Sequence, residues 1–148
     1  MKFLHSEKFL DLKAGDLMIP LERVAHVQSN NSLEHALLVL TKSGYTAVPV
    51  LDYHDRLHGL ISTPLIMEAI LGLERIEFEK LEKIRVEEVM NKKIPRIRPD
   101  SPLHQYLHLL VDHPFICVEN ESGFFEGIVT RRVVLDLLTK KSSFPAEL

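Results

Sequence analysis

Apolar and polar residues alternate along this chain in two nearly identical blocks. The first block contains an apolar stripe at helical spacing, formed by Leu33, Ala36, Leu37 and Leu40. The second contains the same stripe 70 positions later, formed by Leu103, Tyr106, Leu107 and Leu110. A glycine followed by two apolar residues and a Ser or Thr also recurs, at 59–62 and again at 127–130. These patterns predict a duplicated structural unit.

The first copy is predicted to run strand, helix, strand, strand, helix. Its strands are expected at 24–27, 46–51 and 59–62, with one helix after Asn31 or Ser32 and another at 63–71. Pro49 suggests a sheet edge or a bulge, because proline cannot donate to a strand ladder. Thr63 suits the helix N-cap, since Pro64 follows at the first helical position.

The second copy repeats this order. Strands are expected at 96–98, 115–119 and 127–130, and helices at 101–111 and 132–138. Between the copies, residues 74–83 carry mixed charges that predict a solvated helical linker. Each copy follows a similar lead-in, at 15–18 and 87–90. We therefore divide the chain into repeat 1 with its lead-in (1–72), a linker (73–85), and repeat 2 with a tail (86–148).

Composition narrows the class of protein. The 148 residues are 45% hydrophobic and 26% charged, with a formal net charge of -3, which is typical of a globular protein that does not bind nucleic acid. No apolar run is long enough for a membrane span or a signal peptide, so a cytoplasmic location is expected. The single cysteine, Cys117, lies in an apolar run and is expected to be a buried, inert thiol.

Catalytic and metal-site patterns are weak. His104 and His108 lie one helical turn apart but lack a third ligand nearby. Residues 52–58 hold two aspartates and two histidines, yet turns favour Asp for backbone reasons alone. We find neither a nucleophile motif nor a phosphate-cradling glycine loop. The sequence thus predicts no catalytic residues, metal or cofactor. A small metal-dependent hydrolase is the least favoured alternative.

The motifs of both copies together resemble the tandem CBS-domain family over about residues 14–140. They are an Asp-hydrophobic-Met lead-in at 16–18, a hydrophobic-proline strand at 47–50, and the glycine turns that begin at Gly59 and Gly127. The resemblance implies an α/β fold of two β-α-β-β-α repeats related by a pseudo-twofold axis. It also implies a disc-like homodimer that forms through the helices at 64–71 and 132–138.

The same resemblance implies pockets that combine strands of one copy with the Ser/Thr turn of the other. In the first pocket the expected ligand-binding residues are Arg23, Val24, Ala25, His26, Tyr45, Thr46, Ala47, Thr130, Arg131 and Arg132. The second pocket would combine residues 95–97, 114–116 and 62–64.

The residues of the Ser/Thr turns favour one class of ligand. Family members that bind AMP or ATP usually carry an aspartate three residues after the Ser or Thr, where it clamps the ribose diol. This chain has Leu65 and Val133 there. Arg131 and Arg132 stand instead at a helix start, where guanidinium groups and backbone N–H groups favour phosphate. A ligand with phosphates but no free ribose diol, such as cyclic-di-AMP, fits these features.

The segments 24–27, 33–42, 72–81 and 130–135 are similar to the small stand-alone cyclic-di-AMP-binding CBS proteins of Gram-positive bacteria, the DarB/CbpB group. This resemblance implies a non-enzymatic signalling protein whose ligand-free form docks on a protein partner. The implied partner is a guanosine tetra/pentaphosphate synthetase-hydrolase or pyruvate carboxylase. An AMP- or ATP-sensing CBS module remains the main alternative.

Overall fold

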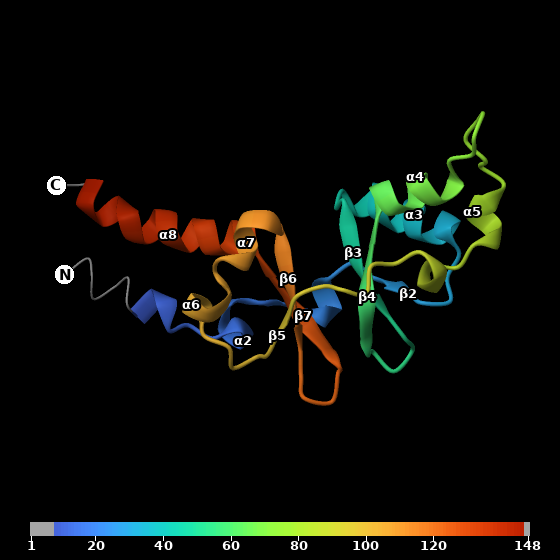
Figure 1. The fold of residues 1–148 in the computed structure, drawn as a ribbon. Coiled ribbons are helices and arrows are strands. Elements are labelled where there is room, and N and C mark those ends of the chain that lie inside the picture. The colour runs from blue at the N-terminus through green and yellow to red at the C-terminus, as the bar shows by residue number, and fades with distance from the viewer. Residues whose placement is uncertain (1–7, 147–148) are drawn as a thin grey trace. The chain divides into compact units, whose positions relative to one another are not determined.

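The two sequence copies fold into two small mixed sheets of similar design. The computed structural model describes residues 8–146, with side chains described as far as Lys140. The chain divides into two units: the first contains the chain up to Val24 and again from Pro95, and the second contains Ala25–Ile94. Figure 1 labels most helices and strands of both units, coloured from blue to red along the chain.

Each unit contains one sheet with its helices. The elements of the first unit are α2 (Ala14–Leu17), β1 (Ile19–Pro20), the 3-10 turn η1 (Leu21–Arg23), β5 (Arg96–Ile97), α6 (Leu103–Tyr106), α7 (Leu109–Asp112), β6 (Phe115–Glu119), β7 (Phe125–Thr130) and α8 (Arg131–Ala146). Those of the second unit are β2 (Val27–Gln28), α3 (Leu33–Ser43), β3 (Ala47–Leu51), β4 (Leu57–Ser62), α4 (Thr63–Ile70), α5 (Lys80–Lys83) and the 3-10 turn η2 (Val86–Glu88). The predicted order of strand, helix, strand, strand, helix is confirmed in the first copy; the second copy follows it except that the helix expected at 101–111 is divided into α6 and α7.

The two sheets share their strand directions. In the first unit the order is β1-β7-β6-β5, with β7 antiparallel to both neighbours and β5 parallel to β6. In the second unit the order is β2-β3-β4, with β2 parallel and β4 antiparallel to β3. Here the place of β1 is taken by Asn91, which forms a single bridge with Leu60.

Each unit buries its own apolar core. In the second unit, Leu33, Ala36 and Leu40 of the predicted stripe are at most 2% exposed and pack against the sheet with Ile66 and Ile70 of α4. In the first unit, the large side chains of Phe9, Leu103, Tyr106 and Ile116 fill the corresponding core. The helical periodicity therefore identified the buried faces of both copies.

The lead-ins are exchanged between the copies. The N–H groups of Ala14 and Gly15 donate to the carbonyls of Ser101 and Pro99, at 2.9 and 2.8 Å, so the first lead-in packs on the second copy. The segment before the second copy packs on the first, where the N–H groups of Val86 and Glu87 donate to Asn31 and Ser29. The predicted ranges 1–72, 73–85 and 86–148 follow the sequence repeats, whereas the compact units divide the chain at residues 24 and 95.

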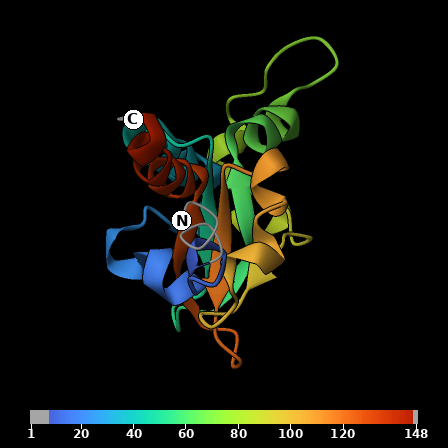
Figure 2. The same cartoon turned by 90° about the vertical axis from the view of Figure 1, so that its left-hand side faces the viewer.

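Local corrections concern proline and the linker. β3 is the central strand of its sheet, so the edge alternative for Pro49 is wrong. Pro49 pairs in register with Leu60, and the irregularity lies next to it, between Val50 and Leu51. The linker is helical only at Lys80–Lys83, so a helix over 74–83 is wrong. The N–H of Gly72 donates to the carbonyl of Arg75, which folds residues 71–79 into a loop beyond α4 (Figures 1 and 2).

Candidate ligand-binding site

The turn from β7 into α8 places Thr130, Arg131 and Arg132 at a helix start. Thr130 is 9% exposed, and its Oγ1 accepts the N–H of Val133 at 3.1 Å as a helix N-cap. The N–H of Arg131 donates to the carbonyl of Pro114 at 2.8 Å. Because these two N–H groups already have acceptors, the capacity of this turn to bind an anion rests mainly on its two guanidinium groups.

The equivalent turn of the first copy has the same backbone but no cations. The Oγ of Ser62 accepts the N–H of Leu65, and the N–H of Thr63 donates to the carbonyl of Thr46. Ser62 is therefore the N-cap of α4, and the expectation that Thr63 fills this position is wrong.

Arg131 is half-buried and bound to the end of a helix. Its Nε donates to the carbonyl of Leu110 at 2.7 Å, and its Nη2 donates to that of Val111 at 3.2 Å. These carbonyls lie in α7, near the helix C-terminus, where cationic side chains are favoured. The positive charge of Arg131 at the start of α8 is thus offset by the last turn of α7.

Arg132 is exposed and has no hydrogen-bond or ion-pair partner among the residues that the structure describes. Its position is unfavourable in isolation, because the N-terminus of α8 also carries partial positive charge. An anionic ligand would relieve both charges, so Arg132 is the cation of this turn that is available for a phosphate.

Arg23 and Val24 belong to the same unit as the Thr130 turn but lie toward the other end of β7. Arg23 is exposed at the end of η1, whereas Val24 is buried, with 7% exposure. The antiparallel register pairs Pro20 with Gly127, so the residues after Pro20 continue toward the beginning of β7. Within the first unit, these two predicted site residues are therefore not brought beside Thr130.

The remaining predicted site residues come together in the second unit. Ala47 begins β3 and pairs with Ser62, while Tyr45 and Thr46 precede it and are exposed. Val27 of the parallel strand β2 pairs with Val50, which directs the preceding Ala25 and His26 toward the beginning of β3. The two expected strand segments of the pocket thus lie along one another.

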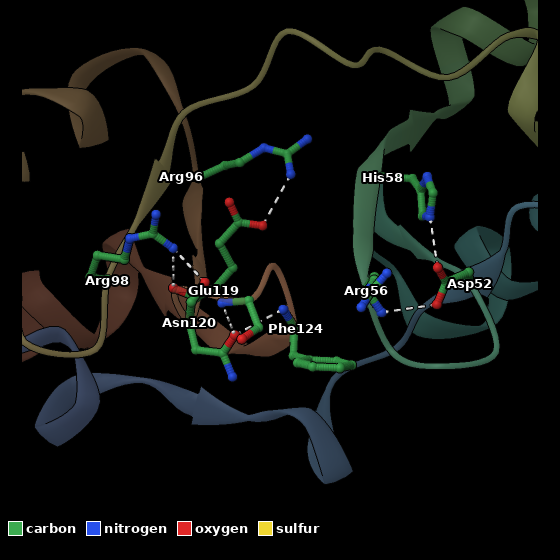
Figure 3. A network of polar contacts seen from close by, with 9 residues as sticks. Asp52, Arg56, His58, Arg96, Arg98, Glu119, Asn120 and Phe124 are labelled. Carbon is green, nitrogen blue, oxygen red and sulfur yellow. Dashed lines mark hydrogen bonds and ion pairs between the residues drawn. The ribbon is translucent and has the colours of Figure 1, made fainter.

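A polar network at the strand turns holds residues that the sequence left without a role (Figure 3). Asp52 Oδ1 accepts the N–H groups of His54 and Arg56, and Asp52 Oδ2 lies 3.0 Å from Nε2 of His58. The hydrogen bond with His58 is the main reason why the pKa of Asp52 falls to about 2, with the two backbone N–H groups adding to this effect. These contacts fix the β3–β4 turn.

The corresponding turn of the second copy is fixed by Asn120, whose Oδ1 accepts the N–H groups of Ser122 and Phe124 (Figure 3). Nearby, Arg96 forms an ion pair with Glu119 at 3.1 Å. Arg98 donates to the backbone carbonyl of Asn120. Arg96, which was expected in the second pocket, is therefore already paired with a carboxylate.

The sequence did not predict an apolar groove of about 300 Å³ in the first unit. It is lined by Leu107, Leu110, Val111, Arg131, Val134, Leu135 and Leu138. Val111 and Leu135 are 76% and 52% exposed, which is unusual for large apolar side chains. In the sequence, the one indication of this groove was the apolar residue Val111 at the end of the predicted helix.

Residues 8–146 contain little that would support a metal site or a membrane-spanning helix. Within the side chains described, no group of three His, Cys, Asp or Glu residues comes together, and His104 and His108 are both exposed. Cys117 is buried, and burial is the main reason why its pKa rises to about 12. None of the helices described has the length and apolar character needed to cross a bilayer.

Comparison with known proteins decides the family. The profile of the CBS domain matches residues 14–72 and 86–140, which together are most of the chain. The chain belongs to the CBS-domain family. Each CBS match begins at a lead-in; the first ends just after α4 and the second ends within α8. The tandem CBS pair that the motifs resembled is thereby confirmed, with its two small mixed sheets.

Relatives with known names extend the CBS assignment. Cyclic di-AMP receptor B of Bacillus subtilis is 56% identical over 137 residues, which cover 93% of each chain. A crystal structure of Listeria monocytogenes CbpB in complex with c-di-AMP is 54% identical and has a TM-score of 0.83, covering 88% of this chain and 98% of that one. Another CbpB structure with c-di-AMP is 28% identical, with a TM-score of 0.85 and coverage of 99% and 98%. The chain is thus a homologue of a receptor, which is a binding protein rather than an enzyme.

Proposed function

We propose that this protein is a cytoplasmic, homodimeric cyclic-di-AMP receptor that regulates a partner protein according to its occupancy. The 56% identity to cyclic di-AMP receptor B over nearly the full length of both chains carries the proposal. Arg132, which has no partner among the described residues, supports the same ligand. So do the apolar residues Leu65 and Val133, which stand where members that bind AMP or ATP place aspartate.

The proposed site uses the ten residues expected from the sequence. Arg132 and Arg131 would hold phosphate oxygens, because planar guanidinium groups form charge-assisted bonds with them. Ala25 and Ala47 would leave space for adenine, and Thr130 would shape the turn as its N-cap. Arg23, Val24, His26, Tyr45 and Thr46 complete the proposed set.

Isothermal titration calorimetry with cyclic-di-AMP tests this site. Replacing Arg132 by Met removes a charge-assisted bond, which is expected to weaken binding ten- to hundredfold, or roughly 1.5–3 kcal/mol. Lys42→Met is a matched control, since it removes an exposed charge outside the proposed site and should leave the affinity unchanged. Unchanged affinity in Arg132→Met would reject the assignment of the phosphate site.

The alternative ligand class is AMP or ATP. Titration of the cyclic-di-AMP complex with each nucleotide separates the two possibilities, because a pocket without a diol clamp should not favour an open ribose. Displacement by AMP or ATP at concentrations equal to that of cyclic-di-AMP would favour the alternative. Incubation with the dinucleotide also tests the hydrolase alternative, for which product would appear.

Dimerisation is proposed through α4 and α8. Leu135 and Leu138 of α8 are 52% and 40% exposed, as an unfilled apolar interface requires. Sedimentation equilibrium should therefore give the mass of a dimer, and Leu135→Glu together with Leu138→Glu should shift it toward the monomer. A monomeric wild-type protein would contradict this part of the proposal.

The partner is proposed to bind the ligand-free form, and the guanosine tetra/pentaphosphate synthetase-hydrolase and pyruvate carboxylase are the candidates. A ligand can shift this equilibrium only if the free and bound forms differ in affinity for the partner. Binding of each purified candidate is therefore measured with and without cyclic-di-AMP. Equal affinity for both candidates under both conditions would reject the regulatory switch.

A further inference from the structure

Arg131 belongs to two features of the first unit at once. Its backbone forms the Thr130 turn, where it follows the N-cap residue of α8. Its side chain lines the apolar groove and donates to the carbonyls of Leu110 and Val111, which are themselves groove residues. A change in the position of this guanidinium therefore acts directly on the groove wall.

The end of α7 needs this side chain because it lacks a glycine cap. In the first copy, α3 ends at Gly44, whose left-handed φ of 78° lets its N–H donate to the carbonyl of Leu40. In the second copy, α7 ends at His113 with a φ of -122°, which is extended. Arg131 supplies donors to the last carbonyls instead, whereas the equivalent Thr63 has no guanidinium to do so.

The guanidinium of Arg131 is only partly committed. A guanidinium has five N–H donors. Two of them are engaged by the carbonyls of Leu110 and Val111, which leaves the remaining ones without a partner among the described residues. Because the group is planar and rigid, a phosphate that binds its open edge cannot draw it closer without disturbing both carbonyl bonds.

We propose that Arg131, through its own contact with phosphate, couples phosphate binding at the Thr130 turn to the shape of the groove between α7 and α8. A phosphate diester on the open edge competes with the carbonyls of Leu110 and Val111 for the guanidinium and loosens the end of α7. This coupling rests on the proposed function, because it requires a phosphate-bearing ligand at this turn. Arg132 retains the ligand, whereas the shift of the Arg131 guanidinium on phosphate binding changes the groove wall.

Methyl NMR on the full-length protein tests the coupling. Val111 and Leu138 have methyl groups in the groove wall. In the wild type, saturating cyclic-di-AMP should shift these methyl signals. In Arg131→Met, the ligand should still bind through Arg132, but the Val111 and Leu138 signals should no longer respond to it.

Arg132→Met is the matched comparison, because it removes the neighbouring cation and keeps the carbonyl bonds of Arg131. Its affinity should fall ten- to hundredfold, but at saturation the groove signals should shift as in the wild type. Arg131→Lys keeps the charge without the planar fork and should respond only weakly. If circular dichroism shows that Arg131→Met does not fold, Arg131→Lys takes its place in the experiment.

The possible outcomes separate the two proposals. Absence of cyclic-di-AMP binding by the wild type would reject the proposed function itself. Binding without a response at Val111 and Leu138, or a full response in both Arg131 variants, would overturn the coupling alone. Complete loss of binding in both Arg131 variants would also overturn it, because the coupling requires that Arg132 can retain the ligand without Arg131.

Discussion

Asp55 and Gly123 stand 68 positions apart and adopt the same left-handed backbone conformation, with φ of 66° and 86°. In both turns the N–H of this residue donates to the carbonyl three residues earlier, in Asp52 and in Asn120, at 3.0 Å each. The two copies therefore use one turn geometry, which only the second copy fills with glycine. Aspartate tolerates this region better than most residues but still carries a steric cost.

Asp55→Gly should raise the free energy of unfolding, by about 0.5 kcal/mol, because relief of the left-handed strain exceeds the added chain entropy of glycine. Gly123→Ala should lower it by about 1 kcal/mol for the opposite reason. Urea denaturation of both variants measures these changes. A loss of stability in Asp55→Gly would mean that the aspartate side chain contributes more than its backbone conformation costs.

Gly59 and Gly127 allow the exchanged lead-ins to lie against the strands. A Cβ at Gly59 would stand 2.5 Å from the carbonyl oxygen of Asn91, and one at Gly127 would stand 2.2 Å from that of Ile19. Because the obstacles are backbone atoms, alanine at either position should cost about 1–3 kcal/mol of unfolding free energy. Gly15→Ala, where the nearest atom is 3.2 Å away, is the milder control. Equal stability of all three variants would contradict this packing.

Tyr106 carries a buried hydroxyl that has no hydrogen-bond partner among the described residues. Its side chain is 1% exposed, and burial raises its pKa to about 12. Tyr106→Phe removes an unsatisfied polar atom, so the free energy of unfolding should rise by about 1 kcal/mol. Tyr53→Phe, at a residue that is 82% exposed, should have no effect. Thermal unfolding compares the two, and a lower melting temperature for Tyr106→Phe would indicate a hydrogen bond to that hydroxyl.

Asp52 should make stability depend on pH in the acid range. Its pKa falls from 3.8 to about 2, mainly through His58, so the folded state favours the carboxylate. A lowered carboxyl pKa adds stability that is present above about pH 4 and is lost as the pH falls toward 2. Asp52→Asn keeps an oxygen for the N–H groups of His54 and Arg56, as Asn120 does for its own turn, but removes the charge.

The measurement is the difference in unfolding midpoint between wild type and Asp52→Asn across this range. The wild type should be the more stable at pH 5, and the difference should shrink as the pH approaches 2. The pKa of Glu79 is also about 2, because Arg75 binds it. Since this ion pair is present in both proteins, its effect on stability cancels in the difference. A difference that stays constant with pH would show that the charge of Asp52 adds no stability.

The sequence predicted the elements whose signals are local. The strand at 115–119 has its predicted bounds, and Leu33, Ala36 and Leu40 form the buried face of a helix as their spacing indicated. The repeat strengthened each prediction, because every pattern had a second copy against which to compare it. The family followed from the same residues.

The features that escaped prediction depend on contacts distant in sequence. Ile19 pairs with Ile128, and no local pattern at either residue indicates that the first lead-in adds a strand to the second copy. The spacing placed Arg131 at a helix start but could not reveal that its side chain caps the end of α7, because it bonds to the carbonyl of Leu110, which is distant in sequence. The ligand-binding roles of all ten site residues stay predictions.

The crossed lead-ins make the two halves of the gene product dependent on one another. A fragment that ends at residue 72 would keep Ile19 without the strand it pairs with, and would keep Leu60 without the Asn91 that lies against it. A fragment that starts at residue 86 would lose β1 entirely. Truncation between the copies would therefore expose an unpaired strand edge in each half.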